Sequence, residues 1–94
     1  MFEVELESNG NISLVGRLDA SHADGAQKVL RDLAGSVVAD CSRLDYVSSA
    51  GITVILELHK RLSGSGEQLR LVGMNPRVKT VFSYTGLDKI LAIE

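Results

Sequence analysis

Hydrophobic and polar residues alternate at the start of the chain, and this alternation predicts a hairpin. Over residues 2–7, three apolar side chains alternate with three glutamates, which is the period of a strand with one buried face. Ser8-Asn9-Gly10-Asn11 follows, and Asn-Gly is the strongest short-range hairpin signal. Residues 12–18 alternate again. We therefore expect them to form the returning strand of the hairpin.

Apolar residues then recur at helical spacing in three stretches. The first helix opens at residues 19–21, where Ser21 and Asp24 resemble a capping arrangement, and Gly35 is a natural stop. Its apolar stripe comprises Ala23, Ala26, Val29, Leu30 and Leu33. The second helix, about residues 50–63, is apolar over more than half of its circumference. Its polar stripe comprises Thr53, Glu57, Lys60 and Arg61, in which Glu57 can pair with either cation.

The third helix carries its own start and stop signals. Asn75 followed by Pro76 predicts an N-cap and a first helical residue, and Gly86 ends the helix. Its buried edge comprises Val78, Val81 and Phe82.

Short apolar runs between these helices predict the remaining strands. Residues 36–41 are continuous and apolar apart from their ends, as expected for a central strand covered on both faces. Residues 68–72 and 89–93 form two further short strands. The order β-β-α-β-α-β-α-β indicates a single α/β domain over residues 1–94. We expect a mixed sheet of four to five strands, with parallel pairs joined by right-handed crossovers.

Two adjacent serines, Ser48 and Ser49, stand where the second helix begins. A helix N-terminus leaves backbone N–H groups unpaired and carries the positive end of the helix dipole. A serine at this position can cap the helix. It can also carry a phosphate, which the free N–H groups and the dipole would tolerate. The local pattern leaves both interpretations open.

The charge, the cysteine count and the lengths of the apolar runs exclude several classes of function. The net charge of −2 and the pI of about 5.6 argue against nonspecific binding to nucleic acid, which requires a basic patch. A single cysteine, Cys41, excludes an internal disulfide, and its place in an apolar run indicates a buried side chain. No apolar run reaches the roughly 18 residues of a membrane helix, and the alternating N-terminus does not resemble a signal peptide. We expect a cytoplasmic protein without membrane insertion.

Catalysis by a serine relay is not supported. His22 and His59 are the two histidines, and His59 lies ten residues from Ser49 on the same helix, about 15 Å away. The Gly-x-Ser-x-Gly elbow of hydrolases is missing. Cys41 and the two histidines show no metal-ligand spacing. We therefore expect no enzyme activity, no catalytic residue, no metal and no cofactor.

Residues 37–52, from Val37-Val38-Ala39-Asp40-Cys41 to Ser48-Ser49-Ala50-Gly51-Ile52, resemble the signature of STAS domains, in particular the bacterial anti-sigma factor antagonists. Gly16-Arg17-Leu18-Asp19 resembles the family's Gly-Glu-Leu-Asp segment, with arginine in place of glutamate. Asn75-Pro76-Arg77-Val78 and Thr85-Gly86-Leu87 resemble the third helix of the family and its ending. The resemblance covers nearly the whole chain in the right order.

The resemblance implies a partner switch. In such families the unphosphorylated protein binds an anti-sigma factor that is also a serine kinase, and thereby frees the sigma factor. The kinase phosphorylates the serine at the helix start, and a phosphatase resets the switch. By motif position that serine is Ser49. The expected partner-binding residues are Asp19, Ser48, Ala50, Gly51, Ile52 and Thr53.

Two other functions remain open at this stage. STAS-like domains also serve as subunits of lipid-transporting ABC systems, where no phosphorylation is needed. Those domains often carry Thr-Ala-Gly at this point, so Ser48-Ser49 favours the switch. The other function is as one module of a larger stress-signalling complex. A homodimer is a further assembly that the resemblance allows.

Overall fold

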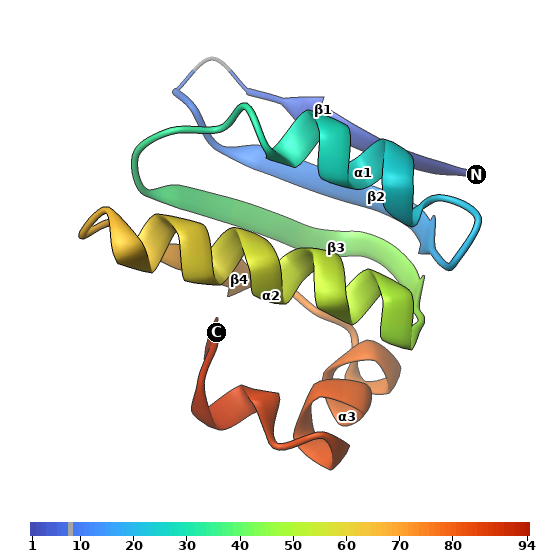
Figure 1. Cartoon of the computed structure of the whole chain (residues 1–94). Coiled ribbons are helices and arrows are strands. Elements are labelled where there is room, and N and C mark those ends of the chain that lie inside the picture. The colour runs from blue at the N-terminus through green and yellow to red at the C-terminus, as the bar shows by residue number, and fades with distance from the viewer. Residues whose placement is uncertain (8) are drawn as a thin grey trace.

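The chain folds into one five-stranded sheet with its helices laid across it, as the computed structural model shows for residues 1–7 and 9–94 (Figure 1). The sheet order is β1-β2-β3-β4-β5, which is also the order along the chain. The elements are β1 (Phe2–Leu6), β2 (Ile12–Leu18), α1 (Ala23–Leu30), β3 (Val37–Val47), α2 (Ser49–Gly64), β4 (Leu69–Val72), α3 (Pro76–Tyr84), a 3-10 turn η1 (Leu87–Lys89) and β5 (Ala92–Ile93). The predicted α/β order and mixed sheet are confirmed.

The predicted N-terminal hairpin is present. β1 and β2 pair antiparallel, with Leu6 opposite Ile12 and Phe2 opposite Gly16. Beyond the strands, the Glu7 N–H donates to the Asn11 carbonyl at 2.8 Å. Ser8, the first residue of the predicted turn, lies outside the described residues.

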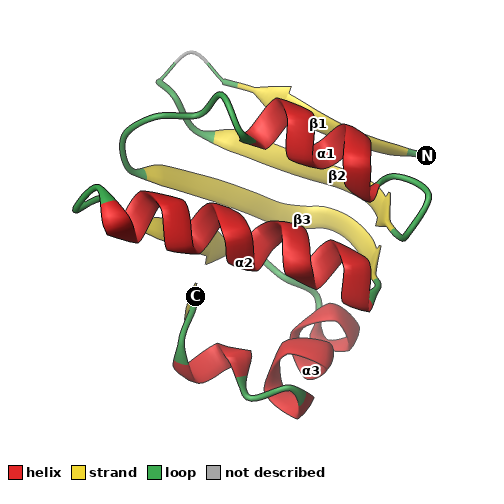
Figure 2. Cartoon of the chain, in the orientation of Figure 1, coloured by secondary structure: helices red, strands yellow, loops and turns green. Residues whose placement is uncertain are grey.

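All other neighbouring strands run parallel, and the helices that connect them gather on one side of the sheet. β2, β3, β4 and β5 pair in chain order. Because each right-handed crossover then steps in the same direction across the sheet, each connecting helix falls on the same face. Figure 2 shows α1 and α2 side by side over this face. The opposite face of the sheet carries no helix in the described part of the chain.

The prediction that residues 36–41 are covered on both faces is therefore wrong. Val37, Ala39 and Cys41 are buried, whereas Val38 and Asp40 between them are only half-buried. This alternation is the mark of a strand with one covered face. The apolar run suggested double coverage because Val38 is apolar, although it points to the open face with Asp40.

β3 is also much longer than the predicted segment, since it continues to Val47. The continuation exists because β2 offers a partner along its whole length, up to the pair Leu18 and Val47. The polar residues that hid this stretch from sequence reasoning are exposed. They comprise Ser42, Arg43 and Asp45.

A single core lies between the sheet and the helices. The completely covered side chains include Leu18 and Leu44 from the sheet and Phe82 from α3, each with 0 % exposure. α2 contributes a buried row to the same cluster, which comprises Ile52, Val54, Ile55, Leu58 and Leu62. The wide apolar surface predicted for this helix is mostly core.

The signals predicted for the third helix are confirmed. The Asn75 side chain accepts a hydrogen bond from the Val78 N–H at 2.9 Å, and Pro76 is the first helical residue. Gly86 follows the helix with a φ of +74°, a left-handed conformation that glycine adopts without strain. The last predicted strand is shorter than expected, because η1 takes up its first residue and only Ala92–Ile93 pair with β4.

Candidate functional site

The candidate site lies where the end of β2 meets the start of α2. β2 and β3 run parallel and end together, with Leu18 opposite Val47. The Ser48 N–H donates to the Leu18 carbonyl at 3.0 Å, so the chain leaving β3 is attached to the chain leaving β2. Asp19 and Ser49 each stand one residue beyond this bond. The tertiary fold therefore brings together the two segments that the sequence singled out separately.

Ser48 caps α2. It has the extended backbone typical of an N-cap, and its Oγ accepts a hydrogen bond from the Gly51 N–H at 3.2 Å. The Ser48 carbonyl accepts from the Ile52 N–H at 2.9 Å, which is the first bond of the helix. The capping interpretation is thus confirmed for Ser48.

Ser49 is the first residue of α2 and is exposed. Its hydroxyl makes no hydrogen bond to any residue in the part of the chain that the structure describes. Its carbonyl accepts from the Thr53 hydroxyl at 3.0 Å, and Thr53 is exposed one turn further along the helix. The two serines therefore have different environments, with Ser48 occupied in the cap and Ser49 turned to solvent.

Gly51 lets the two segments approach closely. A Cβ atom at this position would overlap the Leu18 carbonyl oxygen and would lie 2.7 Å from the Leu18 Cγ. Gly51 is buried. This close packing is by itself a reason for glycine at this position of the Ser-Ser-Ala-Gly motif, whether or not a partner also contacts it. Ile52 is also buried at 8 % exposure, whereas Ala50 is half-buried.

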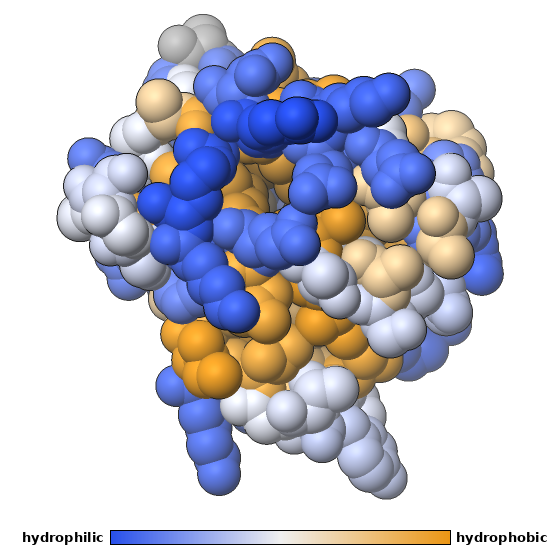
Figure 3. Space-filling model, in the orientation of Figure 1, coloured by the Kyte–Doolittle hydropathy of each residue, from blue (hydrophilic) through white to orange (hydrophobic). Residues whose placement is uncertain are grey.

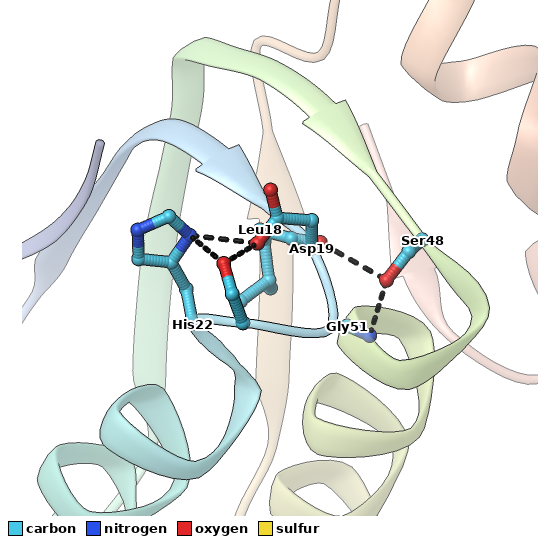
Figure 4. A network of polar contacts seen from close by, with 6 residues as sticks. Leu18, Asp19, His22, Ser48 and Gly51 are labelled. Carbon is cyan, nitrogen blue, oxygen red and sulfur yellow. Dashed lines mark hydrogen bonds and ion pairs between the residues drawn. The ribbon is translucent and has the colours of Figure 1, made fainter.

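A small polar network flanks the capped helix on the loop after β2 (Figure 4). The Ser21 hydroxyl donates to Asp19 Oδ1 at 2.7 Å, and His22 Nδ1 contacts the same oxygen at 2.7 Å. Hydrogen bonds from Ser21, then from His22, lower the pKa of Asp19 from 3.8 to about 2. Asp19 therefore keeps its negative charge at neutral pH, beside the start of α2.

This network corrects the predicted start of α1. Ser21 does not cap the helix, because its hydroxyl is bonded to Asp19. His22 occupies the N-cap position of α1 without a side-chain cap, and the helix begins at Ala23. Sequence reasoning missed Ser21 and His22 as partners of Asp19. The available signal was the short spacing Asp-x-Ser-His, in which polar side chains commonly bond back to a neighbouring residue.

The same geometry bears on enzymatic chemistry. Among the described residues, the Ser48 hydroxyl forms hydrogen bonds with the Leu18 carbonyl and the Gly51 N–H, and with no histidine. Residues 1–7 and 9–94 contain no group of three or more His, Cys, Asp or Glu side chains placed to hold a metal ion. Cys41 is buried as predicted, and burial raises the pKa of its thiol to about 12, so the thiol stays protonated and unreactive.

Comparison with known proteins identifies the family. The family model STAS_2, described as "Mlab, STAS domain", matches residues 2–92. The chain belongs to the STAS family. This assignment confirms the resemblance seen in the Ser-Ser-Ala-Gly motif and in the segments around Asp19 and Asn75.

One relative of this chain is assigned as an anti-sigma factor antagonist. A Bordetella bronchiseptica (strain RB50) protein assigned as the anti-sigma factor antagonist BtrV is 40% identical over 57 residues. The match covers 61% of this chain and 49% of BtrV, so it spans about half the length of that relative.

Solved STAS structures share the fold. A Thermotoga maritima protein assigned as an anti-sigma factor antagonist superposes with a TM-score of 0.83 at 26% identity, covering 99% of this chain and 85% of that one. The unphosphorylated anti-sigma factor antagonist SpoIIAA gives a TM-score of 0.72 at 15% identity, with coverage of 100% and 87%. The phosphorylated form of SpoIIAA from Bacillus gives 0.71 at 17% identity, with coverage of 100% and 91%.

No helix among the described residues of this STAS chain combines the length and the apolar character needed to cross a membrane.

Proposed function

We propose that this STAS domain is an anti-sigma factor antagonist controlled by phosphorylation of Ser49. The proposal depends on one observation, which is that the hydroxyl of Ser48 caps α2 while the hydroxyl of Ser49 faces solvent. Ser48 provides the cap, so the exposed hydroxyl of Ser49 is free to be modified without loss of that hydrogen bond. A phosphate on Ser49 would also lie at the positive end of the α2 dipole, where negative charge is tolerated.

Charge is the physical basis of the switch. A phosphate adds about −1.5 to −2 charges, next to a loop on which Asp19 is already ionised. Taking a complex from 90% to 10% occupancy requires roughly an 80-fold change in affinity, or about 2.6 kcal/mol. One new repulsive contact between two unit charges at roughly 5 Å, with an effective dielectric constant near 20, is on the order of 3 kcal/mol. A single phosphate is therefore sufficient.

The proposed partner surface is the exposed part of the site. Ser49 and Thr53 are exposed, Asp19, Ser48 and Ala50 are half-buried, and all five border the junction of β2 and α2. Gly51 and Ile52 support this surface from below, because both are buried. The partner we propose is an anti-sigma factor with serine kinase activity, and a phosphatase would reverse the modification.

Phosphopeptide mapping of the protein recovered from its own cells tests the proposal. We expect phosphate on Ser49 under some growth conditions and none in the Ser49→Ala variant, with Ser48 unmodified. Ser49→Asp should weaken binding to the kinase, and Ser49→Thr serves as a control that keeps an acceptor hydroxyl.

Undiminished phosphorylation of Ser49→Ala would overturn the assignment of the site. A chain that is never phosphorylated and co-purifies with a membrane transporter would instead support the subunit of a lipid-transporting ABC system. Co-purification within a large assembly of STAS proteins would support the module of a stress-signalling complex.

A further inference from the structure

A groove lies between α1 and α2, further along α2 than the proposed partner surface. It has a volume of about 300 Å³ and is lined by Gln27, Leu30, Arg31, Val54, Glu57, Leu58 and Arg61. Its floor is apolar, since Leu30, Val54 and Leu58 belong to the core and are each less than a tenth exposed. Figure 3 shows hydrophilic side chains over α1 and α2 with hydrophobic surface visible between them.

The groove is locally basic in an acidic protein. Its lining holds two arginines and one glutamate, while the whole chain has a net charge of −2. Arg31 forms no ion pair with the described residues, and Arg61 donates through Nη2 to the Leu30 carbonyl at 2.8 Å. The one acid of the lining, Glu57, accepts a hydrogen bond from the Gln27 amide at 2.7 Å and forms an ion pair with neither arginine. Neither guanidinium therefore has a carboxylate partner among residues 1–7 and 9–94.

Two hydrogen bonds between α1 and α2, Gln27 to Glu57 and Arg61 to Leu30, take the place of an expected ion pair within α2. Glu57 was predicted to pair with Lys60 or Arg61, and instead it reaches across to α1, which leaves the charge of Arg61 without an acid. Arg61 donates a hydrogen bond to the carbonyl of Leu30, the last residue of α1, and this acceptor is uncharged. Such a bond uses one of the five guanidinium donors, so others remain for an incoming carboxylate.

A row of exposed residues on α2 joins the groove to the proposed partner surface. Ser49, Thr53, Glu57 and Arg61 are spaced by four residues on α2, and all four are exposed. Residues at this spacing form one row along a helix. The row spans twelve residues, or about 18 Å, so one partner segment can touch the groove at one end and approach Ser49 at the other.

We propose that this groove docks an acidic, apolar-faced helix of the partner protein. Apolar side chains of that helix would cover the floor, and its carboxylates would pair with Arg31 and Arg61, as in other helix-in-groove recognition. That the docked partner is the one that reads Ser49 rests on the proposed function. The preference for an acidic helix does not.

A synthetic amphipathic helix of leucine and glutamate, titrated into the isotopically labelled protein, tests the proposal by NMR. We expect shifts of the backbone signals of Gln27, Arg31, Glu57 and Arg61, and weakening of binding with added salt. The same peptide with lysine in place of glutamate should give no shifts there. Arg31→Glu should weaken the acidic peptide roughly tenfold or more, whereas the charge-matched Lys79→Glu on α3 should change it by less than about twofold.

The outcomes separate the groove from the switch. Ser49→Asp should leave the affinity for the acidic peptide within about twofold. The added charge lies about 18 Å along α2 from Arg61, which is beyond the screening length at physiological salt. No shifts in the groove at about 1 mM peptide, equal response to the lysine peptide, or shifts confined to the open face of the sheet would each overturn the proposal. None of these results would contradict the proposal that Ser49 is phosphorylated.

Discussion

At the scale of single residues, the site depends on small differences between neighbours. Ser48 and Ser49 are identical in chemistry, yet one accepts a hydrogen bond from Gly51 and the other faces solvent. The difference arises because Ser48 has an extended backbone while Ser49 is already helical. Capping and modification are therefore divided between two residues and do not compete.

The two serines should differ in their effect on stability. We expect Ser48→Ala to lower the free energy of unfolding by about 1 kcal/mol, because it removes the cap of α2. Ser49→Ala should change it by less than about 0.5 kcal/mol. Urea denaturation of both variants measures the difference, and Ser48→Asp, which restores a capping acceptor, should recover most of the loss. Equal effects of the two alanine variants would contradict the assignment of the cap.

Gly51 should be far less tolerant than another helical glycine. Gly51→Ala places a methyl group against the Leu18 carbonyl and side chain, and we expect a loss of about 1–3 kcal/mol in stability. Gly25 in α1 has nothing within 4 Å of its would-be Cβ. Gly25→Ala should therefore be neutral or stabilising by up to about 1 kcal/mol. Thermal unfolding of the pair is the measurement, and a Gly51→Ala variant as stable as wild type would contradict the close packing.

At the scale of elements, side chains attach each helix to the sheet at chosen points. Asn75 both caps α3 and donates through Nδ2 to the Leu44 carbonyl on β3 at 3.1 Å. Arg61 ties α2 to α1, and the Ser48 N–H ties the start of α2 to the end of β2. These bonds set where each helix lies on the sheet, which packing of apolar faces alone would leave looser.

The double role of Asn75 can be separated by substitution. Asn75→Ala removes both hydrogen bonds, and we expect a loss of about 1–2 kcal/mol in the free energy of unfolding. Asn75→Asp keeps the capping acceptor but lacks the donor to Leu44, so its loss should be smaller. Chemical denaturation ranks the three proteins. An aspartate variant as unstable as the alanine variant would show that the bond to β3 carries the effect and the cap does not.

At the scale of the whole molecule, the strand order decides which surfaces exist. The parallel strands follow one another in one direction, so the helices share one face of the sheet and leave the other face open. On that open face Arg43 pairs with Glu5 at 2.6 Å and Arg70 with Glu94 at 2.5 Å. Exposed ion pairs of this kind add little stability. The fold therefore depends mainly on its single core.

Acid should destabilise the whole molecule through its carboxylates. The pKa of Asp19 is lowered in the folded state to about 2, mainly by hydrogen bonds from Ser21 and then His22. Its contribution to stability is complete above about pH 4 and is lost as the pH falls through about 2. Denaturation at a series of pH values should show a decline in this window that is smaller in Asp19→Asn. Ser21→Ala should move the decline to higher pH, because it removes the larger cause of the shift.

Other carboxylates also contribute to the loss of stability of the wild-type protein in acid. The Ser42 backbone N–H lowers the pKa of Asp40, and Arg70 lowers that of Glu94. The comparison between wild type and Asp19→Asn isolates the contribution of the loop beside the site. Identical pH profiles for these two proteins would contradict the role given to Ser21 and His22.

Local patterns in the chain were enough to predict the elements and the position of the motif. Alternation in the hairpin, Asn75-Pro76 at the start of α3 and the serines before α2 all act within a few residues, so they are legible in one sequence. Ser49 as the modified residue stays a prediction. So do the partner-binding roles of Asp19, Ser48, Ala50, Gly51, Ile52 and Thr53.

Contacts between distant segments were beyond the reach of these patterns. The extension of β3 to Val47 depends on pairing with β2, the freedom of Ser49 depends on Ser48 taking the cap, and the groove depends on Gln27 meeting Glu57 thirty residues away. The physical reason is that periodicity reports which face of an element is buried, but not against what. The packing of the helices on one face of the sheet therefore determines which of the predicted residues are exposed to a partner.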